Sequence, residues 1–184
     1  MPIQGDLEKQ RVGWRQDWMT TVADREAIVA LLNEVAAEDI VEIGVHEGWT
    51  ARCILDNVPT VKRYRGTDVL PNYKTSLPQQ QRELPTGPGR YAWSDPRFEL
   101  IIHPRGSLDV NADMIGLCDA VFIDGDHGGA MVMHDTALAI QCACKLIIWH
   151  DYGIVPSVTE TIDGMRESGM PIKCDGTWLA YVKR

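Results

Sequence analysis

The sequence predicts a single α/β domain built on a mostly parallel β-sheet. Short apolar runs alternate with amphipathic stretches along its 184 residues, which is the pattern of repeated βαβ units. Two of these runs, within residues 120–127 and 146–153, end in aspartate and histidine side chains. Buried parallel strands have this form when they stop at the edge of a sheet where ligands bind.

The first half of the chain predicts a helix followed by a strand, a second helix and a second strand. Residues 17–37 contain a helix, because Ile28, Leu31 and Leu32 recur at helical spacing and residues 21–24 can cap its start. A strand is expected at residues 39–45, a helix at residues 49–57 and a second strand at residues 61–69.

The second half continues the alternation and ends in a hairpin. Strands are expected at residues 98–103, 119–124 and 145–149, with helices at residues 130–141 and 157–167. Asp175-Gly176 is a two-residue turn signal, so the strands of the hairpin should be residues 171–174 and 177–182.

Residues 70–97 interrupt this alternation. They hold five prolines and the sequence Thr86-Gly-Pro-Gly89, which predict a long loop with at most a short helix near residues 79–83. Long loops in compact domains commonly cover or bind ligands. Tyr73 could therefore contact a substrate, although it could equally pack the loop against the domain.

Composition limits the classes of partner. A net charge of −8 disfavours nucleic acid, and the chain has neither a continuous apolar run long enough to span a membrane nor a signal-peptide start. Its five cysteines lack the spacing of a zinc site and are expected to be reduced and mostly buried. These features predict a cytoplasmic protein whose partners are small molecules or protein surfaces.

The first strand ends in a glycine motif, Glu42-Ile-Gly44-Val-His46-Glu-Gly48-Trp-Thr50. The two glycines permit a tight turn before a helix whose N-terminal amides could face an anionic group. The spacing differs from the Gly-x-Gly-x-x-Gly of dinucleotide enzymes. At the end of the second strand, Asp68 stands where such folds place an acid that binds a ribose, although a strand-end aspartate can also simply form a turn.

Four side chains should surround one cavity at the ends of the fourth and fifth strands. They are Asp124, His127, His150 and Asp151, whose composition is that of a metal site or an acid/base site. Three interpretations of His150 stay open: a metal ligand, a contact or proton carrier for the substrate, and a structural hydrogen bond.

Together, these motifs over residues 39–153 resemble the class I S-adenosylmethionine-dependent methyltransferases. The sequences Asp124-Gly-Asp-His127 and His150-Asp151-Tyr152 are more narrowly similar to the macrocin-type sugar O-methyltransferases and cephalosporin-hydroxylase-like proteins. The resemblance implies a Rossmann-like fold, with a seven-stranded sheet, helices on both faces and a C-terminal antiparallel hairpin. It also implies one domain, residues 1–184, with a cofactor half over about 39–110, an acceptor half over about 119–184 and an insertion at 70–97.

The resemblance implies roles for single residues. S-adenosylmethionine would be the cofactor: Asp68 would bind its ribose, Ser107 would lie near its adenine and Asp124 would also border it. The methionine part would be held by residues of the glycine motif, namely Glu42, Gly44, His46, Gly48 and Thr50.

The implied reaction is O-methylation of a small hydroxylated molecule, with Asp124 and His127 as catalytic residues and His127 as the base. In metal-dependent relatives a divalent ion, usually Mg²⁺, is held at the positions of Asp124, His150 and Asp151. An imidazole at position 150 suits Mn²⁺, Fe²⁺ or Zn²⁺ better than Mg²⁺, so the use of a metal stays open. Other open alternatives are a cofactor-binding protein without methyl transfer, a cephalosporin-hydroxylase-like enzyme, and a homo-oligomer whose partner completes the site.

Overall fold

The computed structural model describes residues 19–184, in which seven strands form one sheet in the order β3-β2-β1-β4-β5-β7-β6. The strands are β1 Asp39–Ile43, β2 Arg63–Val69, β3 Phe98–His103, β4 Ala120–Ile123, β5 Leu146–Trp149, β6 Lys173–Cys174 and β7 Ala180–Lys183. All pairs from β3 to β5 are parallel, whereas β7 pairs antiparallel with both β5 and β6. The predicted fold, a mostly parallel sheet with a C-terminal hairpin, is confirmed.

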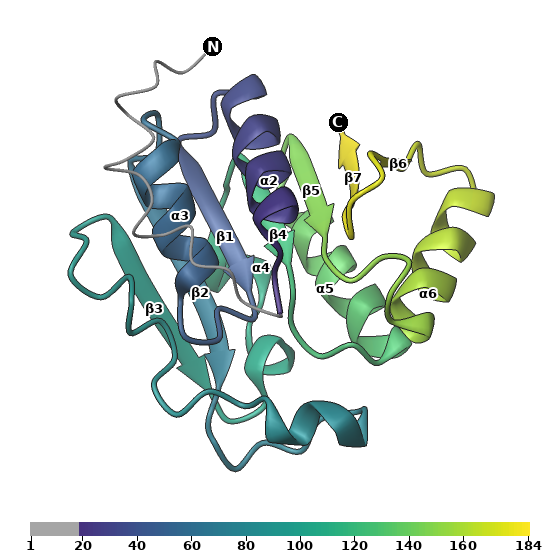
Figure 1. The fold of residues 1–184 in the computed structure, drawn as a ribbon, viewed down its shortest axis with the longest axis horizontal. Coiled ribbons are helices and arrows are strands. Elements are labelled where there is room, and N and C mark those ends of the chain that lie inside the picture. Colours follow the sequence, from purple (N-terminus) through teal and green to yellow (C-terminus); the bar gives the residue numbers. More distant parts are fainter. Residues whose placement is uncertain (1–18) are drawn as a thin grey trace.

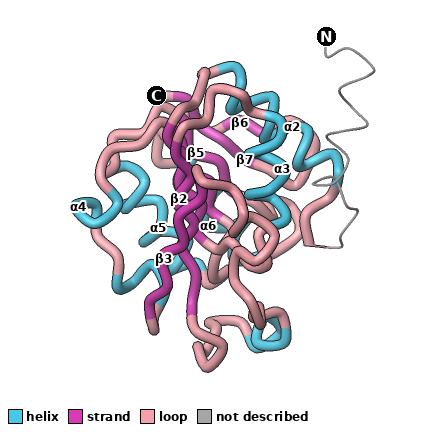
Figure 2. The backbone as a smooth tube through the Cα atoms, turned by 90° about the vertical axis from the view of Figure 1, so that its left-hand side faces the viewer, coloured by secondary structure: helices cyan, strands magenta, loops and turns pink. Residues whose placement is uncertain are grey.

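Helices cover both faces of the sheet (Figure 1). The helices are α2 Val22–Glu34, α3 Trp49–Asn57, α4 Ala112–Ile115, α5 Gly129–Gln141 and α6 Pro156–Glu167, with 3₁₀ turns η1 Pro78–Arg82 and η2 Gly106–Asp109. Seen along the sheet, α2 and α3 lie on one side of the strands and α4 and α5 on the other (Figure 2). The predicted elements are all present, whereas η2 and α4 were not predicted.

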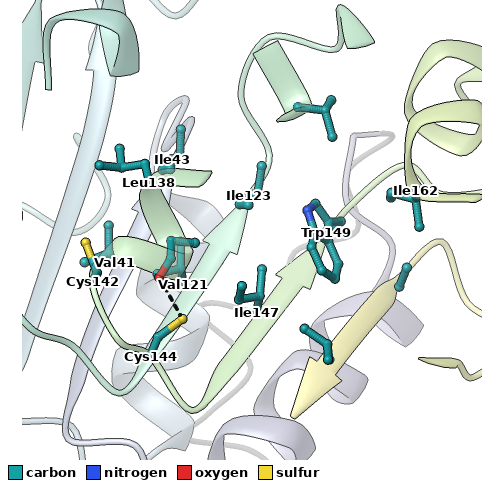
Figure 3. Close-up of a cluster of buried hydrophobic side chains, with 14 of the residues drawn as sticks. Val41, Ile43, Val121, Ile123, Leu138, Cys142, Cys144, Ile147, Trp149 and Ile162 are labelled. Atoms are coloured by element: carbon teal, nitrogen blue, oxygen red, sulfur yellow. Dashed lines mark hydrogen bonds between the residues drawn. The ribbon is translucent and has the colours of Figure 1, made fainter. Parts of the chain in front are cut away.

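Two apolar cores lie on the two faces of the sheet. One joins β1 and β4 to α2 and α3 through Ile28, Ile40 and Phe122, while the other packs α5 and α6 on β4 and β5. In the second core, the Trp149 side chain is fully buried between Ile147 and Ile162 (Figure 3). Its indole N–H donates to Thr136 Oγ1 at 2.9 Å. Because β4 and β5 are buried along their whole length, they fix the position of whatever follows them.

The C-terminal hairpin differs in detail from the predicted one. Lys173 pairs with Tyr181 and Cys174 with Ala180, so residues 175–179 form the connection instead of a two-residue turn at Asp175-Gly176. Asp175 accepts hydrogen bonds from the Thr177 amide and hydroxyl, which explains the turn signal. Within this connection, the Trp178 amide donates to Asp24 Oδ1 of α2 at 3.0 Å, which holds the connection against α2.

Candidate active site

The carboxyl ends of the parallel strands open onto a cavity of about 330 Å³, a size that suits a small ligand. Each of four strands supplies a lining residue at its end: Gly44 from β1, Asp68 from β2, Asp124 from β4 and Asp151 from β5. Since these strands are parallel, residues far apart in the sequence meet at one edge of the sheet.

Most of the predicted site residues line this cavity. They are Gly44, His46, Asp68, Ser107, Asp124, His127 and Asp151. The other four, Glu42, Gly48, Thr50 and His150, lie outside the described lining, and each has another environment that accounts for its position.

Gly44 is needed where β1 meets the end of β4. Its φ of +88° is in the left-handed region, and a Cβ there would lie 2.2 Å from the carbonyl oxygen of Asp124. Only glycine permits this approach, which brings the two halves of the cavity together.

Gly48 permits close contact between the glycine motif and the insertion. Its φ is +86°, and a Cβ there would lie 2.9 Å from the Cα of Gly89. The Gly89 amide donates to His46 O at 2.7 Å and the Tyr91 amide to Glu47 O at 3.0 Å. The insertion thus lies against the start of α3, where Thr50 is buried. The spacing of the two glycines reflects chain packing at both positions.

Asp68 is fixed by backbone amides. The His46 N–H donates to its Oδ2 at 2.6 Å and the Val69 N–H to its Oδ1 at 2.7 Å. Burial raises the pKa of Asp68 to about 6, and these two hydrogen bonds oppose the increase. The carboxylate lines the cavity and keeps further lone pairs for a ligand.

Glu42 lies beneath the cavity, on β1. Its side chain is buried and accepts a hydrogen bond from the Tyr64 hydroxyl at 2.8 Å. Burial raises the pKa of Glu42 well above its usual value, which favours the protonated carboxyl. Glu42 therefore serves here as a hydrogen-bonding group of the core.

Two imidazoles and two carboxylates meet on the other side of the cavity. His127 Nε2 lies 2.9 Å from Asp151 Oδ2 and 3.8 Å from Asp124 Oδ1. His150 Nδ1 lies 3.2 Å from the Oδ1 atoms of both acids. The backbone of Asp151 has a φ of +61°, a left-handed conformation that is uncommon outside glycine and is stabilised here by the surrounding contacts.

His150 connects this cluster to α2. Its side chain is about 1% exposed, and its Nε2 lies 3.5 Å from Asp24 Oδ2, whose side chain is equally buried. Asp24 was missed by the sequence reasoning, because its place in the Thr21–Asp24 capping box fully explains it locally. No sequence signal pointed to its second contact.

The charges in the cluster shift one another's pKa values. Burial alone would lower the pKa of His127, but the nearby carboxylates of Asp124 and Asp151 raise it to about 9. The same acids, helped by Asp24, hold the pKa of His150 well above its usual value in spite of burial. The pKa of Asp151 is lowered, since its bonds to His127 and His150 outweigh burial. His127 is therefore mainly cationic at neutral pH.

One set of side chains could hold a metal ion. Ligand atoms of Asp124, His127 and Asp151 all lie within 4.8 Å of one another. Two carboxylate oxygens and one imidazole nitrogen suit a divalent ion that accepts nitrogen, such as Mn²⁺ or Zn²⁺. In this set His127 takes the place that the sequence reasoning gave to His150.

The insertion and the hairpin complete the cavity wall. Tyr73 and Gln80 line it from the insertion, and Trp178 lines it from the connection between β6 and β7. Two further tryptophans, Trp14 and Trp18, lie outside the described residues.

No helix among residues 19–184 is long and apolar enough to cross a membrane.

Comparison with known proteins agrees with this architecture. Residues 41–152 match the methyltransferase domain family. No curated protein sequence matches the chain.

Several solved structures share the fold. The SAH-bound methyltransferase PaMTH1 from Podospora anserina is 11% identical, with a TM-score of 0.65 over 99% of this chain and 88% of that one. A putative O-methyltransferase from Klebsiella pneumoniae is 17% identical, with a TM-score of 0.61 over 100% and 92% of the two chains. An O-methyltransferase from Bacillus cereus in complex with SAH is 13% identical, with a TM-score of 0.59 over 100% and 93%.

At these identities the structural similarity shows the fold alone. The family match covers more than half of the chain and therefore shows the family. The chain therefore belongs to the methyltransferase domain family, and the prediction of a methyltransferase with the class I fold is confirmed.

Proposed function

We propose that this protein transfers the methyl group of S-adenosylmethionine to a hydroxyl oxygen of a small molecule in the cytoplasm. The observation that carries the proposal is the single cavity that Asp68 lines from one side and Asp124, His127 and Asp151 line from the other. Solved O-methyltransferases with the same fold, one of them bound to SAH, support it. In this single domain, residues 39–110 would hold the cofactor and residues 119–184 the acceptor.

The cofactor side would act by positioning. Asp68 offers carboxylate lone pairs to the ribose hydroxyls, while His46 and Ser107 border the same space. When bound, the cofactor supplies an activated methyl group on a sulfonium sulfur. The protein must then hold an oxygen in line with that carbon and accept a proton.

The acceptor side would remove the proton. His127 would accept the proton of the acceptor hydroxyl as that oxygen takes the methyl group, and the cofactor, when bound, would supply the methyl and keep the electron pair of the carbon–sulfur bond on its sulfur. Asp151, 2.9 Å from His127 Nε2, would stabilise the imidazolium that results. Because the pKa of His127 is about 9, the rate should rise about tenfold per pH unit between pH 6.5 and 8.5 if the neutral imidazole is the base.

A metal ion would change the role of His127. Asp124, Asp151 and His127 would hold the ion, which would lower the pKa of the acceptor hydroxyl. The imidazole could not accept a proton through a nitrogen that binds the ion, so the two roles exclude each other at that atom. Stimulation by Mn²⁺ or Zn²⁺ and loss with a chelator would indicate the metal mechanism, whereas indifference to both would favour His127 as the base.

The test begins with cofactor binding. Calorimetric titration with S-adenosylmethionine and SAH should show micromolar binding that Asp68→Ala abolishes, and no binding of either compound would refute the proposal. Methyl transfer to panels of catechols and polyols follows, with His127→Ala as the inactive control. Binding of the cofactor without transfer to any hydroxyl compound would favour the alternative of a methyltransferase-like binding protein.

A further inference from the structure

A covering segment, residues 73–85 of the insertion, lines the cavity opposite the sheet. Eight of its side chains contribute to the lining: Tyr73, Thr75, Leu77, Gln79, Gln80, Glu83, Leu84 and Pro85. Its 3₁₀ turn η1 is the helical turn at the bottom of Figure 1, beyond the carboxyl ends of the strands. The segment contacts the turn at residues 125–128, which joins β4 to α5 and carries His127.

Gln80 bonds this turn with both ends of its amide. The His127 N–H donates to Gln80 Oε1 at 3.0 Å, and Gln80 Nε2 donates to the Gly125 carbonyl at 3.3 Å. The Gln80 residue is 9% exposed, so losing either bond would leave a buried polar group without a partner. From the opposite side, the Ser157 hydroxyl donates to His127 O at 2.7 Å.

Asp126 fastens the covering segment to the same turn. Its Oδ2 accepts hydrogen bonds from the Ser76 amide at 2.7 Å and the Tyr73 hydroxyl at 3.1 Å, while its Oδ1 accepts from the Gly128 amide. A Cβ on Gly128 would lie 2.5 Å from Ser76 Cβ, so this approach requires glycine. The sequence motif around Asp126 therefore joins two segments in addition to forming a turn.

We propose that Gln80 is a positioning residue for His127, so that the covering segment holds the proton acceptor in place as well as enclosing the cavity. This inference rests on the proposed function for its catalytic consequence. Its structural part, the dependence of the His127 backbone on Gln80, stands independently. Displacement of a reacting group by about 1 Å can cost about 100-fold in rate, so the effect should be large in turnover.

The test compares neighbouring glutamines in the full-length protein. Gln80→Met removes both polar ends, and Gln80→Glu keeps the shape but puts an acceptor opposite the Gly125 carbonyl. The control is Gln81→Met: among residues 19–184, Gln81 bonds only to Tyr73 O and the Thr75 amide, both within the covering segment, and it does not line the cavity. Amide exchange is followed by NMR on ¹⁵N-labelled protein, with SAH affinity and methyl transfer measured on the same samples.

We expect the His127 amide to exchange at least about tenfold faster in Gln80→Met, which removes its acceptor, and faster by a smaller factor in Gln80→Glu, which keeps an acceptor for this amide but repels the Gly125 carbonyl. Exchange at His127 should be unchanged in Gln81→Met. Turnover should fall by about 10- to 100-fold in the Gln80 variants, with a much smaller change in SAH affinity. Unchanged exchange at His127, or equal losses of turnover in Gln80→Met and Gln81→Met, would overturn the inference. If the wild type methylates no acceptor, the proposed function fails, and the exchange comparison alone decides whether Gln80 positions His127.

Discussion

The two sides of the cavity are held together by different forces. On the side of β1 and β2, backbone contacts fix the site: Gly44 packs on the Asp124 carbonyl, and Asp68 accepts two main-chain amides. On the side of β4 and β5, charge holds the site: His127 lies against the carboxylate of Asp151, and His150 lies against that of Asp124. Changes of shape should therefore disrupt the first side most, and changes of charge the second.

The largest effect is expected from Gly44→Ala. A Cβ 2.2 Å from a backbone oxygen cannot be accommodated without moving β1 or β4, and the φ of +88° adds strain. We expect the free energy of unfolding, measured in urea, to fall by about 3 kcal/mol or more.

Gly176→Ala is the matched control for Gly44→Ala. Gly176 has a similar φ of +91°, but no heavy atom would lie within 4 Å of a Cβ there. The cost should be that of the backbone conformation alone, about 1 kcal/mol. Equal losses in the two variants would show that the contact with Asp124 does not hold the two sides together.

Asp151→Asn tests the charged side. Asparagine tolerates the φ of +61°, so the substitution removes charge with little change of shape. In metal-free buffer at pH 6, the free energy of unfolding should fall by about 1–3 kcal/mol, because His127 and His150 lose a shared hydrogen-bonded carboxylate.

The pH dependence of this loss identifies its cause. The pKa of His127 is raised to about 9 in the folded protein, so the stability that it contributes is complete below pH 6.5 and disappears as the pH rises through 9. The difference between wild type and Asp151→Asn should therefore shrink between pH 6 and pH 9.5. A difference that is the same at both values would mean that packing, rather than charge, holds this side.

The corresponding experiment on the side of β1 and β2 follows the titration of Asp68. Its pKa of about 6 means that it becomes protonated just below neutral pH. If the ionised carboxylate binds the ribose, SAH affinity measured by calorimetry should weaken by about tenfold per pH unit below pH 6. Asp68→Asn should bind weakly at every pH.

Asp135 is the control for the Asp68 titration. It is another buried acid whose pKa is raised to about 6, and it lies beside Ser107. Asp135→Asn should keep the pH dependence of SAH binding if Asp68 is its source. If SAH binding loses its pH dependence in Asp135→Asn and keeps it in Asp68→Asn, the group that titrates is Asp135 and not Asp68.

The sequence correctly predicted those helices and strands whose own residues show a clear local pattern. α3 and β3 have the predicted bounds, because hydrophobic periodicity and strand composition mark them locally. The convergence of Asp68, Asp124 and Asp151 also followed from sequence, since parallel strands end at one edge. The short α4 and η2 carried too few residues for any period to be visible.

What the sequence could not give is pairing between distant segments. Gly48 indicates a tight turn, but nothing in its neighbourhood shows that Gly89 lies against it. His127 and His150 both follow buried strands, and only the structure separates the imidazole that lines the cavity from the one buried behind the acids. Asp24 and Gln80 each have an ordinary local explanation and make their long-range contacts in addition to it.

The smallest effect on stability is expected in the capping box of α2, where a local role can be separated from a long-range contact. Thr21→Ala removes the Oγ1 that accepts the Asp24 amide at 3.1 Å and should lower the free energy of unfolding by about 1 kcal/mol. Asp24→Asn disturbs the same cap and also the contact with His150. Combined with Asp151→Asn in urea denaturation, Thr21→Ala should be additive within about 0.5 kcal/mol, whereas Asp24→Asn should not. If both combinations are additive, Asp24 acts only as a helix cap, and the charged cluster extends no further than His150.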